Sequence, residues 1–142
     1  MILTSTSRNS LSLPVVAAGT DVWWLQYAIP LADIEPGTEL HARGKIQGKN
    51  YNTFDVEFRC GLFVQDGLFN PTSSSGVLHP LTGENIGPAV SDKYNVADEA
   101  WSFSMPSGLS EPFLVFRVSL RSTQSTSTTR IQFGNGYLQL TD

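Results

Sequence analysis

The side chains that could carry out catalysis or bind a metal ion are few and lie far apart in the sequence. The histidines are His41 and His79, and neither has a nucleophile or a second ligand at a recognised motif spacing. Asp92, Asp98 and Glu99 form an acidic group, which we interpret as solvated loop charges, with a calcium site as the alternative. The sequence predicts no catalytic residue, no metal site and no cofactor, so we do not expect an enzyme.

Aromatic side chains are more informative. In the first tryptophan-containing segment, strand alternation places Trp23 and Tyr27 on the core face and Trp24 on the opposite face. The same alternation turns Phe63 and Val115 away from the core on their own strands. An outward aromatic residue on a β-sandwich is a platform for sugar stacking, a surface covered by another subunit, or a surface covered by loops of the same chain.

The composition limits the class of protein. The chain has 142 residues, enough for one domain with its own core, and 40% of them are hydrophobic. Only 15% are charged and the net charge is −4, which argues against binding to a nucleic-acid backbone. Cys60 has no second cysteine to pair with and lies in an apolar run, so we expect a buried thiol.

The start of the sequence bears on localisation. Residues 1–10 have no basic region leading into an apolar one, and no window of the chain approaches about 18 apolar residues. We therefore expect a protein that is made in a cytosol without a signal peptide and that has no membrane partner.

Turn residues recur along the chain, with strand-like runs between them and no sustained helical periodicity. This pattern predicts an all-β fold, a two-sheet antiparallel sandwich of the jelly-roll kind with about eight strands in one domain over 1–142. Near the end, a Gly-Asn-Gly sequence at 134–136 predicts a tight hairpin between strands at 130–133 and 137–140.

The clearest pair of strands covers 38–47 and 54–65, where apolar and polar residues alternate. We predict that the two form a hairpin. One register places apolar residues opposite each other on the inner face and Arg43 opposite Glu57 on the outer face.

Two segments outside the regular strands are candidates for contacts with other proteins. Residues 66–95 are rich in Gly, Pro and Ser and predict a long loop with one short strand at most. Residues 1–10 are rich in Ser and Thr and predict an N-terminal arm with an apolar tip. The predicted interface residues in these segments are Ile2, Leu3, Leu68 and Phe69.

Three motifs carry a resemblance to a known group of proteins: Pro-Gly-Thr and an alternating strand at 36–42, a tryptophan leading a strand at 101–106, and the final segment 131–140. Together they resemble the small jelly-roll modules of bacteriophage capsid-decoration and tail-fibre proteins and of carbohydrate-binding modules. The resemblance implies a sandwich that acts by binding. Many sugar-binding members have an aspartate before the last strand, where this chain has Asn135.

We therefore expect a virion structural protein, a capsid decoration or cement protein that stabilises the capsid surface through protein–protein contacts. The implied partners are the major capsid protein or other virion proteins, and the implied state is a homo-oligomer, either a trimer or a dimer. The alternative is a carbohydrate-binding or receptor-binding module of a tail fibre or lectin-like protein, with Trp24 as the surface for a glycan.

Overall fold

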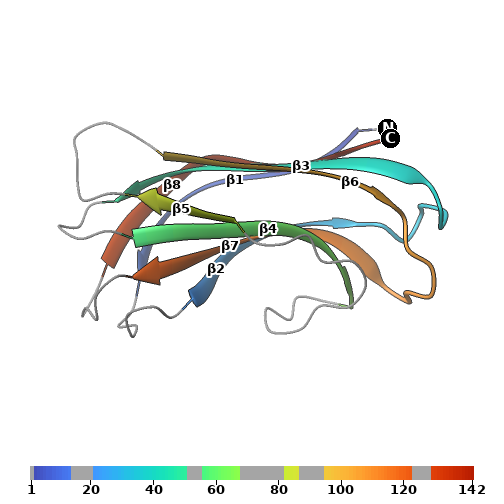
Figure 1. Ribbon diagram of the computed structural model, residues 1–142, viewed down its shortest axis with the longest axis horizontal. Coiled ribbons are helices and arrows are strands. Elements are labelled where there is room, and N and C mark those ends of the chain that lie inside the picture. The colour runs from blue at the N-terminus through green and yellow to red at the C-terminus, as the bar shows by residue number, and fades with distance from the viewer. Residues whose placement is uncertain (1, 14–20, 51–55, 68–81, 87–94, 123–128) are drawn as a thin grey trace.

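Eight strands make up the described part of the chain in a computed structural model of the protein (Figure 1). The structure describes residues 2–13, 21–50, 56–67, 82–86, 95–122 and 129–142, with side chains over 26–49, 60–67, 98–118 and 134–142. The strands are β1 (Ile2–Leu13), β2 (Asp21–Pro30), β3 (Glu39–Asn50), β4 (Val56–Asp66), β5 (Thr82–Ile86), β6 (Asn95–Ser104), β7 (Pro112–Ser122) and β8 (Thr129–Thr141).

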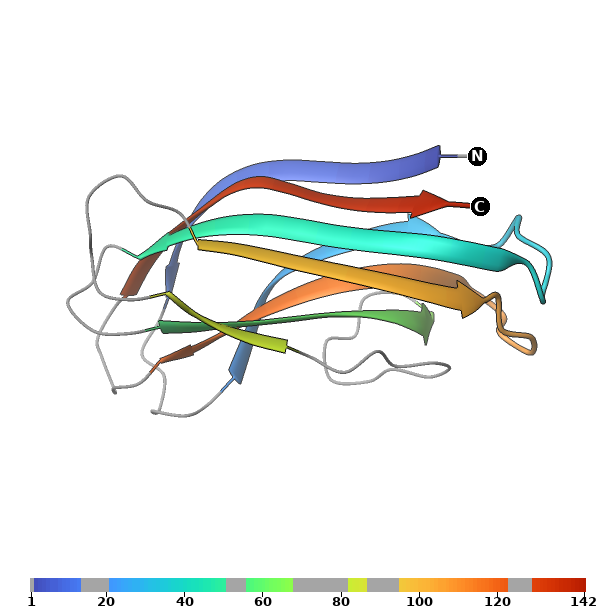
Figure 2. The same cartoon turned by 45° about the horizontal axis from the view of Figure 1, so that its top comes forward.

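The strands form two four-stranded sheets, in the order β1-β8-β3-β6 and β2-β7-β4-β5, and every pairing is antiparallel. Apart from β4 and β5, which pair with each other, consecutive strands lie in opposite sheets (Figure 2). Two sheets connected in this way are the jelly-roll arrangement. The predicted fold class, a two-sheet antiparallel sandwich with eight strands, is confirmed.

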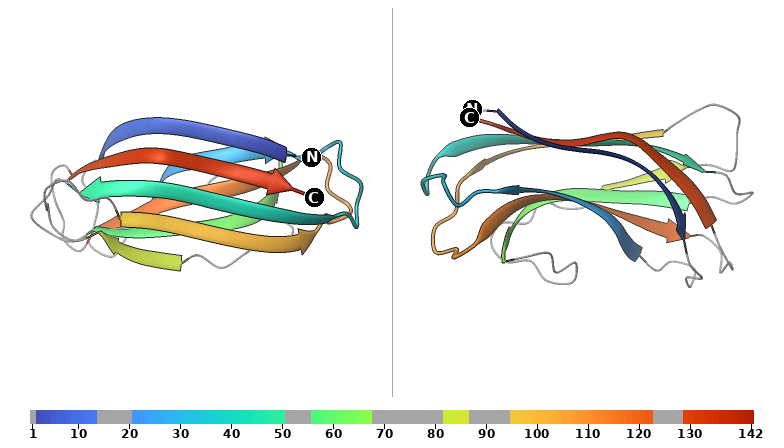
Figure 3. Two further views of the ribbon diagram at one scale, coloured as in Figure 1. Left: turned by 90° about the horizontal axis from the view of Figure 1, so that it is seen from above. Right: turned by 180° about the vertical axis from the view of Figure 1, so that it is seen from behind.

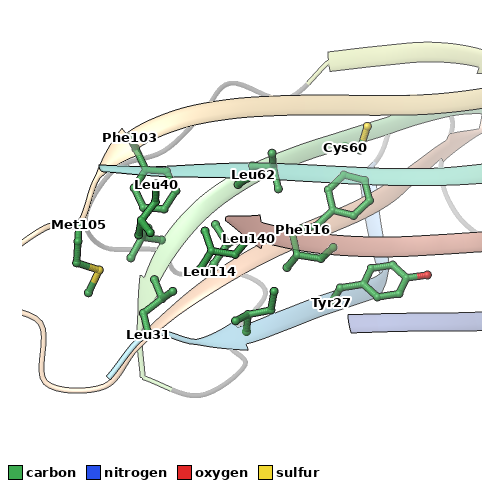
Figure 4. Close-up of a cluster of buried hydrophobic side chains, with 14 of the residues drawn as sticks. Tyr27, Leu31, Leu40, Cys60, Leu62, Phe103, Met105, Leu114, Phe116 and Leu140 are labelled. Carbon is green, nitrogen blue, oxygen red and sulfur yellow. The ribbon is translucent and has the colours of Figure 1, made fainter. Parts of the chain in front are cut away.

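The core lies between the sheets and follows from strand alternation. On β3 and β4, every second residue points inward, so Leu40 and Leu62 are fully buried. Leu114 on β7 and Leu140 on β8 complete the same cluster from neighbouring strands (Figure 4). Alternation alone therefore places the main core residues.

Two glycines let aromatic rings of one sheet approach the backbone of the other. A Cβ atom on Gly44 would lie 2.3 Å from Cδ2 of Phe116, so the ring occupies the space that a side chain would fill. A Cβ atom on Gly136 would lie 2.0 Å from Oη of Tyr27. The rings of Phe116 and Tyr27 stack with centroids 6.0 Å apart. These contacts fix how the two sheets sit on each other.

The predicted hairpin between residues 38–47 and 54–65 is wrong. β3 pairs with β6 and β8, whereas β4 lies in the other sheet between β7 and β5. Arg43 consequently forms its ion pair with Asp98 of β6, not with Glu57. The reason is physical: two alternating strands with opposite charges on their polar faces fit each other in sequence, but the chain crosses to the opposite sheet between β3 and β4.

The predicted hairpin at Gly134-Asn135-Gly136 is also wrong, because β8 runs without interruption through this segment. The pairings shift there against both neighbours, between Ser7 and Asn9 on β1 and between Lys45 and Gln47 on β3. Asn135 has φ 52, and its side chain donates a hydrogen bond of 3.0 Å to Oε1 of Gln47. A residue at positive φ serves a β-bulge as well as a turn, and here it bends a continuous strand.

The bulge gives a prediction for Asn135. Asn135→Gly should be neutral or slightly stabilising, because glycine adopts positive φ without steric cost. Asn135→Val should lower the free energy of unfolding by about 1–2 kcal/mol, since a β-branched residue is strained in this region. Chemical denaturation of the two variants measures the difference. Equal stabilities would contradict the left-handed conformation.

Two further predictions concern the segments 1–10 and 66–95. Residues 2–10 lie within β1, which pairs with β8 from Ile2↔Thr141 to Leu13↔Thr129, so they do not form a projecting arm. Within 66–95 the structure describes β5, which pairs with β4, and the long loop stays a prediction. The segments 68–81 and 87–94 lie outside the described residues.

Candidate interaction surfaces

The outer face of the second sheet carries apolar side chains that are buried within the chain. Phe63 and Val115 alternate with the core residues Leu62 and Leu114, and each is 1% exposed although neither belongs to the core between the sheets. The prediction that both side chains point away from the core agrees with this placement. Because Phe63 is already buried in the single chain, its ring is not an open platform.

A buried arginine organises this face. Arg117 of β7 is 4% exposed, and its Nε donates a hydrogen bond of 2.9 Å to Oε1 of Gln26. Its Nη2 donates a bond of 2.8 Å to Oε1 of Gln65, which is also buried. The guanidinium carbon lies 4.4 Å from the centroid of the Phe63 ring, within cation–π distance. We call Gln26, Phe63, Gln65 and Arg117 the Arg117 cluster.

The electrostatics of the Arg117 cluster follow from desolvation. Burial lowers the pKa of Arg117 to about 10, so the guanidinium still carries its charge at neutral pH. The sequence reasoning missed this residue. A single arginine at a polar position of an alternating strand gives no signal that distinguishes a buried side chain from a solvated one.

The outer face of the first sheet is exposed and polar. The ring Nδ1 of His41 and Oγ of Ser102 lie at a hydrogen-bond distance of 2.8 Å. Arg43 binds both carboxylate oxygens of Asp98, with Nη2 to Oδ2 at 2.6 Å and Nε to Oδ1 at 3.0 Å. These contacts connect β3 to its edge neighbour β6, which lies beside it in Figure 3, and they are made by polar side chains on an exposed face.

The Arg43–Asp98 pair is predicted to contribute little and to depend on salt and pH. Its hydrogen bonds lower the pKa of Asp98, so the contribution is present above about pH 4, the usual range of an aspartate, and is lost as the pH falls through the lowered value. A double-mutant cycle with Arg43→Ala and Asp98→Ala should give a small coupling energy that disappears in about 1 M salt. A coupling that persists in high salt would contradict this.

One end of the sandwich gathers the chain termini and two ordered connections, and we call it the terminal end (Figure 3). The connections are residues 31–38 and 105–111. They are joined by hydrogen bonds from Gly37 N to Met105 O and from Met105 N to Thr38 O, both 2.8 Å. Ile34 on the first connection and Leu109 on the second are half-buried apolar residues that pack against the core. The terminal end is therefore an ordered surface that includes two half-buried apolar residues.

The two connections also carry carboxylates. Asp33, Glu35 and Glu111 are exposed there. Asp66 accepts a hydrogen bond of 2.7 Å from the backbone N–H of Glu111, which lowers the pKa of the Asp66 carboxyl. The terminal end thus presents negative charge at neutral pH.

The structure places the predicted interface residues as follows. Ile2 pairs with Thr141 and Leu3 with Leu140, so both lie where β1 begins at the terminal end. Leu68 and Phe69 lie outside the described residues. They follow Gly67, whose N–H donates a hydrogen bond of 2.8 Å to Glu111 O at the same end.

The orientation predicted for Trp24 rests on an alternation that the strand does not keep. Trp23 pairs with Ser119 and Leu25 with Val118, so Trp24 is an extra residue at a bulge of edge strand β2. Alternation cannot be carried across such a bulge. The described side chains begin beyond Trp24, so its role as a sugar platform stays a prediction.

The residues considered for metal binding do not come together. Asp98 and Glu99 lie in strand β6 and not in a loop; Asp98 is exposed and Glu99 is buried, so neighbouring positions face opposite ways. His79 and Asp92 lie outside the described residues. Within the described part of the chain, no three His, Cys, Asp or Glu side chains are grouped to hold a metal ion. In the same residues, no helix is long and apolar enough to cross a membrane.

Comparison with known proteins finds a likeness in structure alone. No family model and no curated protein matches the sequence. Among solved structures, a chain of infectious bursal disease virus, Gt strain, matches with a TM-score of 0.58 at 10% identity over 99% of this chain. The VP2 subviral particle of the same virus matches with a TM-score of 0.53 at 10% identity, also over 99% of this chain. The chain spans 32% of the length of each of these viral chains. The likeness extends over the whole jelly roll.

Proposed function

We propose that the protein is a virion structural protein that binds a capsid surface as a decoration or cement protein. The observation that carries the proposal is the jelly roll itself, which matches viral capsid chains over 99% of this chain. A jelly roll also occurs in lectin domains, so the fold alone does not distinguish a contact with a capsid from a contact with a glycan. The exposed outer face of the first sheet and the terminal end are ordered surfaces, which suits them to a broad contact with another protein.

The terminal end is the surface that we propose for the capsid contact. Ile34 and Leu109 are half-buried apolar residues on ordered connections. The start of β1 lies at the same end, as does Gly67, which precedes Leu68 and Phe69 in the sequence. A stable contact buries roughly 1,200–2,000 Å² in total, which needs several such segments together. Repetition of the contact around a symmetric particle raises the overall affinity through effective concentration.

The charge of the terminal end indicates the character of the partner. Exposed carboxylates such as Asp33, Glu35 and Glu111 favour a capsid surface that presents lysines and arginines. Attachment should therefore become slower and weaker as the salt concentration rises.

Sedimentation with capsids tests the proposal. The probe is the particle with which the protein co-purifies, stripped of the protein and mixed with purified variants. Ile34→Ser with Leu109→Ser, and separately Leu68→Ser with Phe69→Ser, should each lower occupancy at least tenfold. Arg43→Ala, on the exposed outer face of the first sheet, is the matched control and should bind as the unaltered protein does. Circular dichroism and thermal melting establish that each variant is folded.

The outcome that contradicts decoration is full occupancy by both double variants. The start of β1 is not tested by deletion. Removing residues 1–7 would remove the pairings of Ile2 to Ser7 with β8 and would weaken the fold itself.

One observation favours the alternative, a glycan-binding module. Trp24 lies at a bulge of an edge strand, and bulges re-aim side chains at binding sites. Under this alternative, Trp24→Ala would abolish retention on a glycan array and leave particle binding unchanged.

A further inference from the structure

The four edge strands of the sandwich differ in how they are protected against pairing with another strand. β5 is only five residues long. β2 has a bulge at Trp24 and ends at Pro30. β6 carries Asp98 and the inward-facing, buried Glu99. Short length, bulges, proline and inward charges are the features by which natural sheets block addition of a further strand.

β1 is the exception. It spans 12 residues, contains no proline or acidic residue, and has Arg8 as its one charged side chain. It pairs with β8 on one side, and its other side is an edge of the sheet (Figure 2). Among the edge strands in the described part of the chain, β1 is therefore the longest, and Arg8 is its one charge. Its free edge offers backbone hydrogen-bonding groups to another extended strand.

The sequence of β1 is complementary to itself. In an antiparallel pair, facing residues share one face of the sheet, so their numbers must sum to an even value for two copies of one strand. A sum of 14 places Leu3 opposite Leu11 of the partner subunit and Thr4 opposite Ser10 of the partner subunit. This register pairs every residue from 2 to 12 with a residue of the partner subunit.

The neighbouring registers fit less well. A sum of 16 places Arg8 opposite Arg8 of the partner subunit, and like charges that face each other are destabilising. A sum of 12 pairs only residues 2 to 10 and places Leu3 opposite Asn9 of the partner subunit. In the register with the sum of 14, Arg8 faces Thr6 of the partner subunit, so the charge is accommodated.

We propose that a second copy of this chain pairs with β1, antiparallel and about a two-fold axis at Ser7, so that two first sheets join into one continuous sheet. A two-fold contact of this kind uses the same patch on both subunits, as self-complementary β1 requires. The proposal is independent of the capsid partner and can be tested on the protein alone.

Two substitutions of Thr6, one to lysine and one to glutamate, should change the dissociation constant of the dimer in opposite directions. Thr6 pairs with Tyr137 of β8 within the chain, and in the dimer it faces Arg8 of the partner subunit. Thr6→Lys places like charges opposite each other twice and should weaken dimerisation at least fivefold in sedimentation equilibrium. Thr6→Glu should strengthen it, and Thr6→Lys combined with Arg8→Glu should restore it. A dissociation constant that is the same for Thr6→Lys and Thr6→Glu overturns the proposal.

Cysteine cross-linking tests the register. A mixture of Thr4→Cys and Ser10→Cys proteins should form a disulfide-linked heterodimer on mild oxidation, since these positions face each other. Thr4→Cys alone is the matched control and should cross-link at least tenfold less. Cys60 is 1% exposed and does not compete. A monomer at all concentrations, or equal cross-linking in mixture and control, contradicts β1–β1 pairing, and neither result bears on capsid binding.

Discussion

Replacing Gly44 by alanine should lower the free energy of unfolding by about 2–3 kcal/mol, the upper part of the range for an overpacked core. The added Cβ would lie 2.3 to 2.7 Å from three atoms of the Phe116 ring, and Phe116 is fully buried. The Phe116 ring cannot move away from Gly44 without displacing its own neighbours in the second sheet, such as Tyr27. At an unobstructed strand position the same change stabilises by about 0.5–1 kcal/mol, so the sign of the effect reports on the contact.

Phe116→Leu supplies the control for Gly44→Ala. Alone, it should destabilise by removing buried ring atoms. Combined with Gly44→Ala, it should cost less than the sum of the two single changes, because the smaller side chain leaves room for the new methyl group. Denaturant unfolding of the four proteins measures the coupling energy. Strict additivity would contradict the packing of Phe116 against Gly44.

The core could be predicted from the sequence because alternation is a local property of a strand. Leu40, Ala42 and Ile46 on β3 are buried where the period-two pattern places them, as are Leu62 and Val64 on β4. Burying one face of each strand requires two sheets, which is why the fold class could also be predicted.

Strand pairing could not be predicted in the same way, since it depends on where the chain travels between strands. Arg43 has a suitable partner in Glu57 by sequence and in Asp98 by structure, and local complementarity does not distinguish them. Asn135 shows the same ambiguity at shorter range. Its positive φ suits a hairpin turn or a bulge, and only pairing with strands on both sides selects the bulge.

The interaction surfaces depend even more on the tertiary structure. Alternation predicts a direction for Trp24, but a bulge in the pairing of β2 with β7 breaks that rule. Alternation places Phe63 on the outer face, and the structure agrees, yet Phe63 is 1% exposed because burial there depends on the rest of the chain and not on its strand. The terminal end joins residues 31–38 to 105–111, a contact between segments far apart in sequence.

Replacing Arg117 by an uncharged residue should destabilise the protein strongly, unless its hydrogen-bond acceptor Gln65 is replaced by an apolar residue as well. Arg117→Met removes the donors that satisfy Gln65 and Gln26, and a buried acceptor left without a partner costs about 1–3 kcal/mol. We expect a loss of about 2–3 kcal/mol in the free energy of unfolding, chiefly from Gln65, which is 2% exposed.

The companion variants separate charge from hydrogen bonding. Arg117→Lys keeps the charge but lacks the planar fork that reaches Gln26 and Gln65 together, so it should recover only part of the loss. Arg117→Met with Gln65→Leu replaces both partners by apolar groups and should be more stable than Arg117→Met alone. Urea unfolding of the three variants beside the unaltered protein gives the order. If Arg117→Met loses less than about 0.5 kcal/mol, or Gln65→Leu worsens it, the hydrogen bonds do not stabilise this face and packing against Phe63 does.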